Sequence, residues 1–307
     1  MKFSLISDPT FDAGLGHLSR LVALGQELRD RGESYCFHPL GDFPSRHVEF
    51  ILGNLLSIEC SCKGKPDITI IDTYNAGFIN SKVNSGSGIV IQLMDEITPQ
   101  GRCDGFVEVS PIPQFIEYLD TTAVLKFADS PLFRDEIYSL KAEMGPRNLT
   151  ENEGVLILGG VSDSVYFETL KVLKQSLGEK IQGLTVATSS KAVVEMARGL
   201  GVGRSSSLQD IRFIARNFSY VISGAGVTAW ELAFLRIPGF VISLVDNQEF
   251  QLRHLIDNGY RHGVSLSSKN VTTDVLECMR TIREIPLKIP SGGGRQKILD
   301  FIEGICS

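Results

Sequence analysis

Residues 220–248 read YVISGAGVTAWELAFLRIPGFVISLVDNQ, and their pattern indicates the class of fold. Its first apolar run stops at Gly224-Ala225-Gly226, and apolar side chains then recur at helical spacing. The helical pattern ends before Pro238-Gly239, and a second apolar run follows. The order strand, glycine turn, helix, strand is typical of a parallel α/β sheet.

The glycine turn predicts an anion-binding site. Its small side chains let a ligand approach the backbone, and the N–H groups at the following helix start are unpaired and carry partial positive charge. Such a helix start can hold a phosphate without a metal. Glu231, about one helical turn beyond Gly226, offers a carboxylate for the hydroxyls of a ribose, and Asn247-Gln248 follow the next strand. The alternative is an ordinary turn whose glycines only permit close packing.

Length and composition indicate a globular protein with room for two domains. The chain has 307 residues, of which 43% are hydrophobic and 21% charged, which excludes a disordered chain. Its net charge of −6 argues against nucleic acid as a partner. The apolar run before Asp8-Pro9 is too short for a signal peptide, and no segment is long enough for stable membrane insertion. We therefore expect a cytoplasmic protein with reduced thiols.

We expect no metal and no cofactor. Cys60-Ser61-Cys62 lacks a second cysteine pair or nearby histidines, so it is a weak zinc signal. The acidic pair Asp95-Glu96 follows an apolar run, where carboxylates are usually solvated or paired.

Strand and helix patterns alternate in two series, on either side of a polar segment at residues 134–153, which we expect to be a linker. The expected strands include residues 2–7, 34–38, 68–72, 88–94, 105–109, 155–158 and 184–187. This alternation predicts crossover connections and mostly parallel sheets. We predict an α/β protein with two Rossmann-like domains facing across a cleft, at residues 1–140 and 150–290. A last helix lies in residues 291–307 and can return to the first domain.

A second strand–glycine–helix turn, Gly14-Leu15-Gly16-His17, supplies the candidate catalytic base. A histidine side chain titrates at about pH 6.5, so its neutral ring can accept a proton from water or a hydroxyl. The position at a helix start predicts an accessible ring near a bound anion. The alternative is a histidine that caps the helix or bonds to its own loop. Arg20 either contacts phosphate or substrate, or pairs with Asp12 or Asp30.

Ligands of parallel sheets sit beyond the carboxyl ends of the strands, which places His17, Tyr74 and Asp95 at one rim. A third small-residue turn, Gly159-Gly160-Val161-Ser162, follows a strand of the second series. Ser162 either adds a hydroxyl to a diphosphate site or caps the following helix.

Taken together, these motifs resemble the GT-B superfamily. They resemble most closely the UDP-sugar hydrolases of pseudaminic acid biosynthesis (the PseG family) and the related SpsG-like proteins of spore-coat polysaccharide synthesis. The resemblance covers most of the chain. It rests on Gly14-x-Gly16-His17-x-x-Arg20, Ile71-Asp72-Thr73-Tyr74, Asp95 with Cys103-Asp104, Pro131-Leu132-Phe133-Arg134, Gly159-Gly160-x-Ser162-Asp163, Gly224-Ala225-Gly226-x-Thr228, Glu231 and Asn247-Gln248.

The resemblance implies metal-independent hydrolysis of UDP-2,4-diacetamido-2,4,6-trideoxy-β-L-altropyranose to UDP and free sugar. It implies that His17 is the base, that Tyr74 lies near the sugar and that Glu231 holds the ribose. The expected substrate-binding residues are Gly14, Gly16, Arg20, Asp72, Tyr74, Ser162, Asn247 and Gln248. The expected nucleotide-binding residues are Gly224, Ala225, Gly226, Thr228 and Glu231. One departure is Val227, since the family usually has serine before the threonine, and a hydroxyl is lost at the phosphate.

Two other functions fit the same motifs. A MurG-like glycosyltransferase would use the same nucleotide site and pass the sugar to an acceptor hydroxyl. Such enzymes tend to carry a basic, apolar membrane-facing patch, of which only Lys63 and Lys65 are evident here. A non-catalytic protein that binds a nucleotide sugar is the third possibility, and the presence of His17 beside the glycines argues against it.

Overall fold

The computed structural model describes residues 1–7, 16–39, 49, 51, 53, 65–73, 76–84, 88–95, 103–111, 123–127, 130–145, 153–159, 161–206, 210–245, 248–282 and 288–306. The chain forms two compact units. The first comprises Met1–Tyr138 with Ser291–Ser307, and the second comprises Ser139–Pro290. Each unit contains a six-stranded sheet in which all neighbouring strands are parallel.

The sheet of the first unit has the order β2-β1-β3-β4-β5-β6. Its strands are β1 (Lys2–Ser7), β2 (Ser34–Pro39), β3 (Ile68–Asp72), β4 (Ile89–Met94), β5 (Gly105–Glu108) and β6 (Ala123–Leu125). The helices in its described ranges are α1 (Gly16–Asp30), α3 (Ala76–Asn84), α11 (Gly294–Cys306) and α4 (Asp135–Glu143), within which the boundary to the second unit falls. Both faces of this sheet are therefore covered, as parallel sheets require.

Alternate residues of β3 and β4 pack on opposite faces of this sheet, as the two-residue period of a strand dictates. Ile70 and Ile91 belong to the cluster formed with α1 and α11. Ile71 and Val90 belong to a second cluster, which includes Ile79 of α3. The face on which a side chain lies therefore decides whether it meets α1 or α3.

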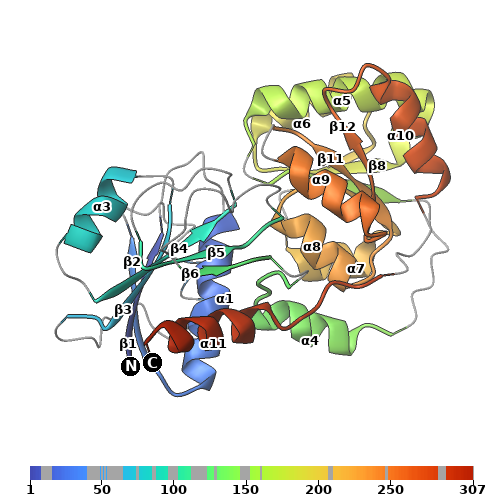
Figure 1. Cartoon of the computed structure of the whole chain (residues 1–307). Helices are drawn as coiled ribbons and strands as arrows, with labels where there is room; N and C mark the ends of the chain where they lie inside the picture. The colour runs from blue at the N-terminus through green and yellow to red at the C-terminus, as the bar shows by residue number, and fades with distance from the viewer. Residues whose placement is uncertain are drawn as a thin grey trace. The chain divides into compact units, whose positions relative to one another are not determined.

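The last helix, α11, belongs to the first unit and lies beside α1 (Figure 1). Its apolar stripe, Ile298, Leu299 and Ile302, is buried in the same cluster as the first strands. Arg31, just after α1, pairs with Asp300 at 2.8 Å and Glu303 at 2.9 Å. The chain thus ends in the unit in which it begins.

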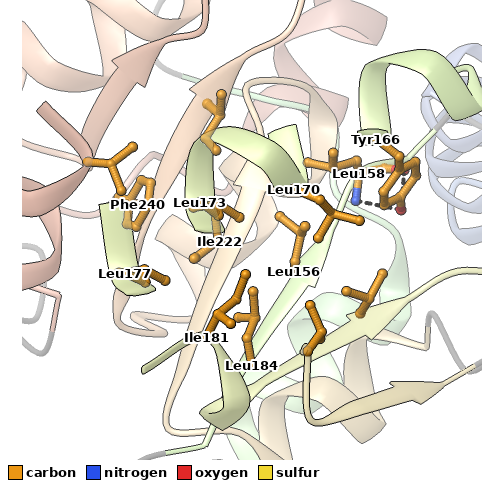
Figure 2. Packing of buried hydrophobic residues seen from close by; sticks show 14 of the residues in the cluster. Leu156, Leu158, Tyr166, Leu170, Leu173, Leu177, Ile181, Leu184, Ile222 and Phe240 are labelled. Atoms are coloured by element: carbon orange, nitrogen blue, oxygen red, sulfur yellow. Dashed lines mark hydrogen bonds between the residues drawn. The ribbon is translucent and has the colours of Figure 1, made fainter. Parts of the chain in front are cut away.

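The sheet of the second unit has the order β12-β11-β10-β7-β8-β9. Its strands are β7 (Gly154–Ile157), β8 (Leu184–Ala187), β9 (Arg204–Ser206), β10 (Tyr220–Gly224), β11 (Gly239–Ser243) and β12 (His262–Ser265). Its α-helices are α5 (Asp163–Leu177), α6 (Lys191–Gly199), α7 (Ile211–Asn217), α8 (Val227–Phe234), α9 (Gln248–Asp257) and α10 (Val271–Arg280). Figure 2 shows α5 residues such as Leu170 and Leu173 packed on Leu156 and Ile222 of the sheet.

Tyr166 ties together the carboxyl ends of two strands. Its hydroxyl accepts from the amide of Leu158 at 2.9 Å and lies 2.8 Å from the carbonyl oxygen of the same residue (Figure 2). It also lies 3.0 Å from the carbonyl oxygen of Ala187, at the end of β8. Burial raises the pKa of Tyr166 to about 12, so the group remains a donor. These bonds hold the start of α5 in place beyond β7.

The local structure differs from the sequence-based expectation in two places. The polar segment at residues 134–153 is not simply a linker, because Asp135–Glu143 forms α4. Ile137 and Leu140 of this helix are fully buried. A short amphipathic helix buries few apolar residues, so its helical pattern is weak in the sequence. Cys36 is disulfide-bonded rather than reduced, whereas Cys103, Cys278 and Cys306 are free. The spacing of scattered cysteines in a sequence does not indicate which of them form a disulfide.

None of the helices in the described ranges is long and apolar enough to cross a membrane.

Candidate functional site

One candidate site, in the first unit, lies where the N-terminal turn of α1 meets the carboxyl ends of β3 and β4. Asp72 ends β3 and lies on the same face as Ile70, which packs against α1. Asp95 directly follows β4, two residues after Leu93 of the same cluster. His17 and Arg20 are three residues apart on α1 and so share one side of that helix.

These four side chains form one hydrogen-bonded network. The Nδ1 atom of His17 lies 2.5 Å from Oδ1 of Asp72. The guanidinium of Arg20 donates to both oxygens of Asp72, from Nε at 2.8 Å and from Nη2 at 2.9 Å. Its Nη1 donates to Oδ2 of Asp95 at 2.8 Å. The two-pronged bond between guanidinium and carboxylate is the strong and geometrically specific form of such a pair.

Asp72 is ionised at neutral pH. Burial alone would raise its pKa, but the positive charge of Arg20, the interaction with His17 and the hydrogen bonds from both lower it to about 2. Its oxygens can therefore only accept hydrogen bonds. In many hydrolases, a buried, ionised aspartate that is hydrogen-bonded to Nδ1 orients a basic histidine.

The protonation of the His17 ring follows from its neighbours. Nη2 of Arg20 lies 3.0 Å from Nδ1 of His17, and the carboxylate of Asp72 is hydrogen-bonded to the same nitrogen. Arg20 can only donate and ionised Asp72 can only accept, so Nδ1 cannot satisfy both. We assign the Nδ1 proton to the shorter bond, toward Asp72. The neutral ring then carries its lone pair on Nε2.

Two expectations about these residues change. The prediction that the His17 ring is accessible is wrong. Asp72 and Arg20 hold the ring against the sheet, and only 4% of the residue is exposed. Arg20 is 6% exposed and pairs with Asp72 and Asp95 rather than with Asp30, which bonds to Arg29 at 2.9 Å. The alternative partner Asp12 lies outside the described residues.

A separate candidate site, in the second unit, is the glycine turn between β10 and α8. Gly226 is the N-cap of α8 and has no side chain that could cap the helix. A Cβ atom built on Gly226 meets nothing within 4 Å, so the turn faces open space. The amide of Ala229 bonds to the carbonyl of Gly226, and the amides of Val227 and Thr228 lie at the half-buried helix start. The turn can therefore accept an anion on its backbone.

Gln248 lies beside this turn. A Cβ atom on Gly224 would come within 3.8 Å of its Oε1, and the same Oε1 accepts from the amide of Leu244 at 3.1 Å. The Gln248 side chain thus satisfies a backbone amide just after β11, next to the glycine turn. Glu231 lies in α8 and is 5% exposed. Its assignment to a ribose remains a prediction.

Ser162 occupies the N-cap position of α5, but its side chain makes no capping bond. Its hydroxyl bonds instead to that of Ser164 at 2.7 Å, and the residue is exposed. Ser162 is therefore at the capping position, as the alternative predicted, but its side chain does not cap the helix. Gly16 begins α1. Three predicted site residues, Gly14, Tyr74 and Asn247, lie outside the described part of the chain.

A cavity of about 450 Å³ occupies another edge of the second unit. It is lined by Glu153, Gln182, Gly183, Thr185, Gly201, Val202, Gly203 and Arg204. Several of these residues directly precede β7, β8 and β9, so the cavity is at the amino ends of the strands. The glycine turn is at the carboxyl end, where ligands of such sheets bind. We therefore do not assign the cavity to the nucleotide.

Comparison with known proteins supports the fold. No protein-family model and no curated protein sequence matches the chain. Among solved structures, it is similar to Acinetobacter baumannii MurG, with 13% identity, a TM-score of 0.58 and coverage of 99% of this chain and 100% of that one. It is also similar to UDP-GlcNAc 2-epimerase from Neisseria meningitidis bound to UDP-GlcNAc, with 10% identity, a TM-score of 0.59 and coverage of 99% and 100%. LpCGTa in complex with UDP matches with 12% identity, a TM-score of 0.59 and full coverage of both chains.

At these identities the similarity concerns the fold alone. The chain has a GT-B-like α/β fold with two six-stranded parallel sheets, which confirms the fold class expected from the sequence.

Proposed function

We propose that this protein hydrolyses a UDP-linked sugar to UDP and the free sugar, without a metal ion. The observation that carries the proposal is the buried His17–Asp72 pair at the carboxyl end of the first sheet. An ionised aspartate on Nδ1 leaves Nε2 as the basic nitrogen. A general base of this kind is what activation of a water molecule needs.

The second unit is proposed to bind the nucleotide. The open glycine turn and the start of α8 offer backbone N–H groups and the positive end of a helix dipole to a diphosphate. The similar epimerase is bound to UDP-GlcNAc and LpCGTa is in complex with UDP, so proteins of this fold do take such ligands.

The proposed reaction is a single displacement. Nε2 of His17 accepts a proton from water as the water oxygen attacks the anomeric carbon. The bond between that carbon and the UDP oxygen breaks, and its electron pair stays on the β-phosphate. Backbone amides at the start of α8 stabilise the growing negative charge. Imidazolium beside ionised Asp72 is stabilised until the proton passes to solvent, and the sugar is released with inverted configuration.

The proposed sugar is a 2,4-diacetamido-2,4,6-trideoxy hexose, used to make nonulosonic acids of the pseudaminic type or a surface polysaccharide. This part rests on the resemblance to the hydrolase family in motifs such as Gly16-His17-x-x-Arg20. The structural similarity to MurG favours one other candidate, transfer of the sugar to an acceptor hydroxyl. Incubation with UDP-sugars, with and without acceptors, separates the two activities.

Glu231→Ala is expected to weaken UDP binding by about 10- to 100-fold. A hydrogen bond from a ribose hydroxyl to a carboxylate is worth about 1.5–3 kcal/mol, which corresponds to that change in Kd. Isothermal titration calorimetry with UDP measures it. Glu168→Ala, an exposed glutamate on α5, is the matched control and should bind as the wild type does. Equal affinity in Glu231→Ala and the wild type would show that Glu231 does not hold the ribose.

A further inference from the structure

Asp95 is joined to the His17–Asp72 pair through a single guanidinium group. Two nitrogens of Arg20 donate to Asp72, and the third, Nη1, donates to Asp95. Three segments that are distant in sequence, the start of α1, the end of β3 and the residue after β4, meet at this planar group. The side chain of Arg20 is 7% exposed and that of Asp95 is 12% exposed.

The geometry of Arg20 explains what Asp95 can contribute. A guanidinium holds its donors in fixed directions, so two bonds to one carboxylate fix the plane of that carboxylate relative to the guanidinium. The guanidinium itself is on a long, flexible stem, and the bond to Asp95 fixes its rotation. Without Asp95, Arg20 regains side-chain freedom and the Asp72 carboxylate is less firmly held. Asp72 is the group that sets the tautomer of the His17 ring.

We propose that Asp95 is a positioning residue for His17, acting through Arg20 and Asp72, and that Arg20 serves this network rather than the phosphates of the substrate. The kinetic part of the inference rests on the proposed hydrolase function. The structural part concerns the His17 tautomer in the ligand-free protein and does not depend on it.

The test compares Asp95→Ala with Asp95→Asn and the wild type. Nitrogen NMR of the ligand-free proteins, with the His17 signals assigned by their loss in His17→Asn, reports the tautomer. We expect the Nδ1–H tautomer in the wild type and a mixture of both tautomers in Asp95→Ala. We also expect kcat to fall by about 10- to 100-fold, the range found for partners that orient metal-ligating histidines. KM should change by less than about threefold, because the proposed role of Asp95 is to position His17 and not to bind the substrate.

Asp95→Asn keeps an oxygen that can accept from Nη1, so it should show a smaller change in both measurements. The matched control is Glu136→Ala, which breaks the 2.9 Å ion pair with Arg134 in the same unit. It should leave the tautomer and kcat unchanged, whereas a general effect of ion-pair loss would alter them too.

A wild-type tautomer in Asp95→Ala overturns the proposal, whatever the activity. If Asp95→Ala does not fold, Asp95→Asn decides alone, and wild-type values in both measurements contradict the proposal. If the tautomer changes as expected while no UDP-sugar is hydrolysed by the wild type, the proposed function fails and the positioning role of Asp95 is supported.

Discussion

His17→Asn is expected to lower the turnover of the UDP-sugar by about 10²- to 10⁴-fold, the range that general-base catalysis typically contributes. Asparagine keeps a polar group of similar size but cannot accept the proton from water. The affinity for UDP should change by less than about twofold, because the proposed nucleotide site belongs to the second unit. Single-turnover kinetics and calorimetry with UDP measure the two effects separately.

His262→Asn is the control for this substitution, since it replaces an exposed histidine on β12. It should retain wild-type turnover. Full activity in His17→Asn would remove the base from the mechanism. A loss of UDP affinity equal to the loss of turnover would indicate that the substitution disturbs binding instead.

Asp72→Asn is expected to have the second large effect, with turnover lowered by up to about 10⁴-fold. The carboxylate is the group that accepts from Nδ1, and an amide that donates toward Nδ1 would force the ring into the unproductive tautomer. The size follows from the equivalent substitution in the serine protease triad, the worked case for this effect. Kinetics of the Asp72→Asn variant, with binding of UDP as the control, measure it.

The same substitution should change the dependence of stability on pH. The folded-state pKa of Asp72, about 2, is below its ordinary value of 3.8. Its stabilisation is therefore present above about pH 4 and is lost as the pH falls toward 2, and it amounts to about 2 kcal/mol. Urea unfolding at pH 7 and pH 3 should show a smaller loss on acidification in Asp72→Asn than in the wild type. Equal losses would mean that Asp72 is not held ionised by Arg20 and His17.

The main elements of the fold could be predicted because their signals are local. The run from Tyr220 to Gly224, the glycines and the helical pattern after them specify β10 and α8 without any knowledge of the rest of the chain. Short edge strands gave weaker signals. β6 is an apolar run, Ala-Val-Leu, of only three residues, which is too short to mark a strand, and β9 reads Arg-Ser-Ser and has no apolar residue. Their pairing depends on the neighbouring strands.

The candidate site was predicted residue by residue, and its connections were not. Each of His17, Arg20, Asp72 and Asp95 stands near a strand end or a helix start, which is a local feature. That Arg20 bridges two carboxylates, 52 and 75 residues away, depends on the order of strands in the sheet. The burial of His17 follows from the same contacts. A helix start alone predicted exposure, because the sequence does not show what packs against it.

Hydrolysis of the UDP-sugar is tested by an NMR time course of the protein with UDP-2,4-diacetamido-2,4,6-trideoxy-β-L-altropyranose and related UDP-sugars, with no acceptor present. We expect equal amounts of UDP and free sugar to form, the sugar to appear first with inverted anomeric configuration, and a chelator to leave the rate unchanged. A sugar released with retained configuration would contradict the single displacement by water. Release of UDP only when an acceptor is added, with the sugar found on that acceptor, would show a transferase and contradict the proposed function.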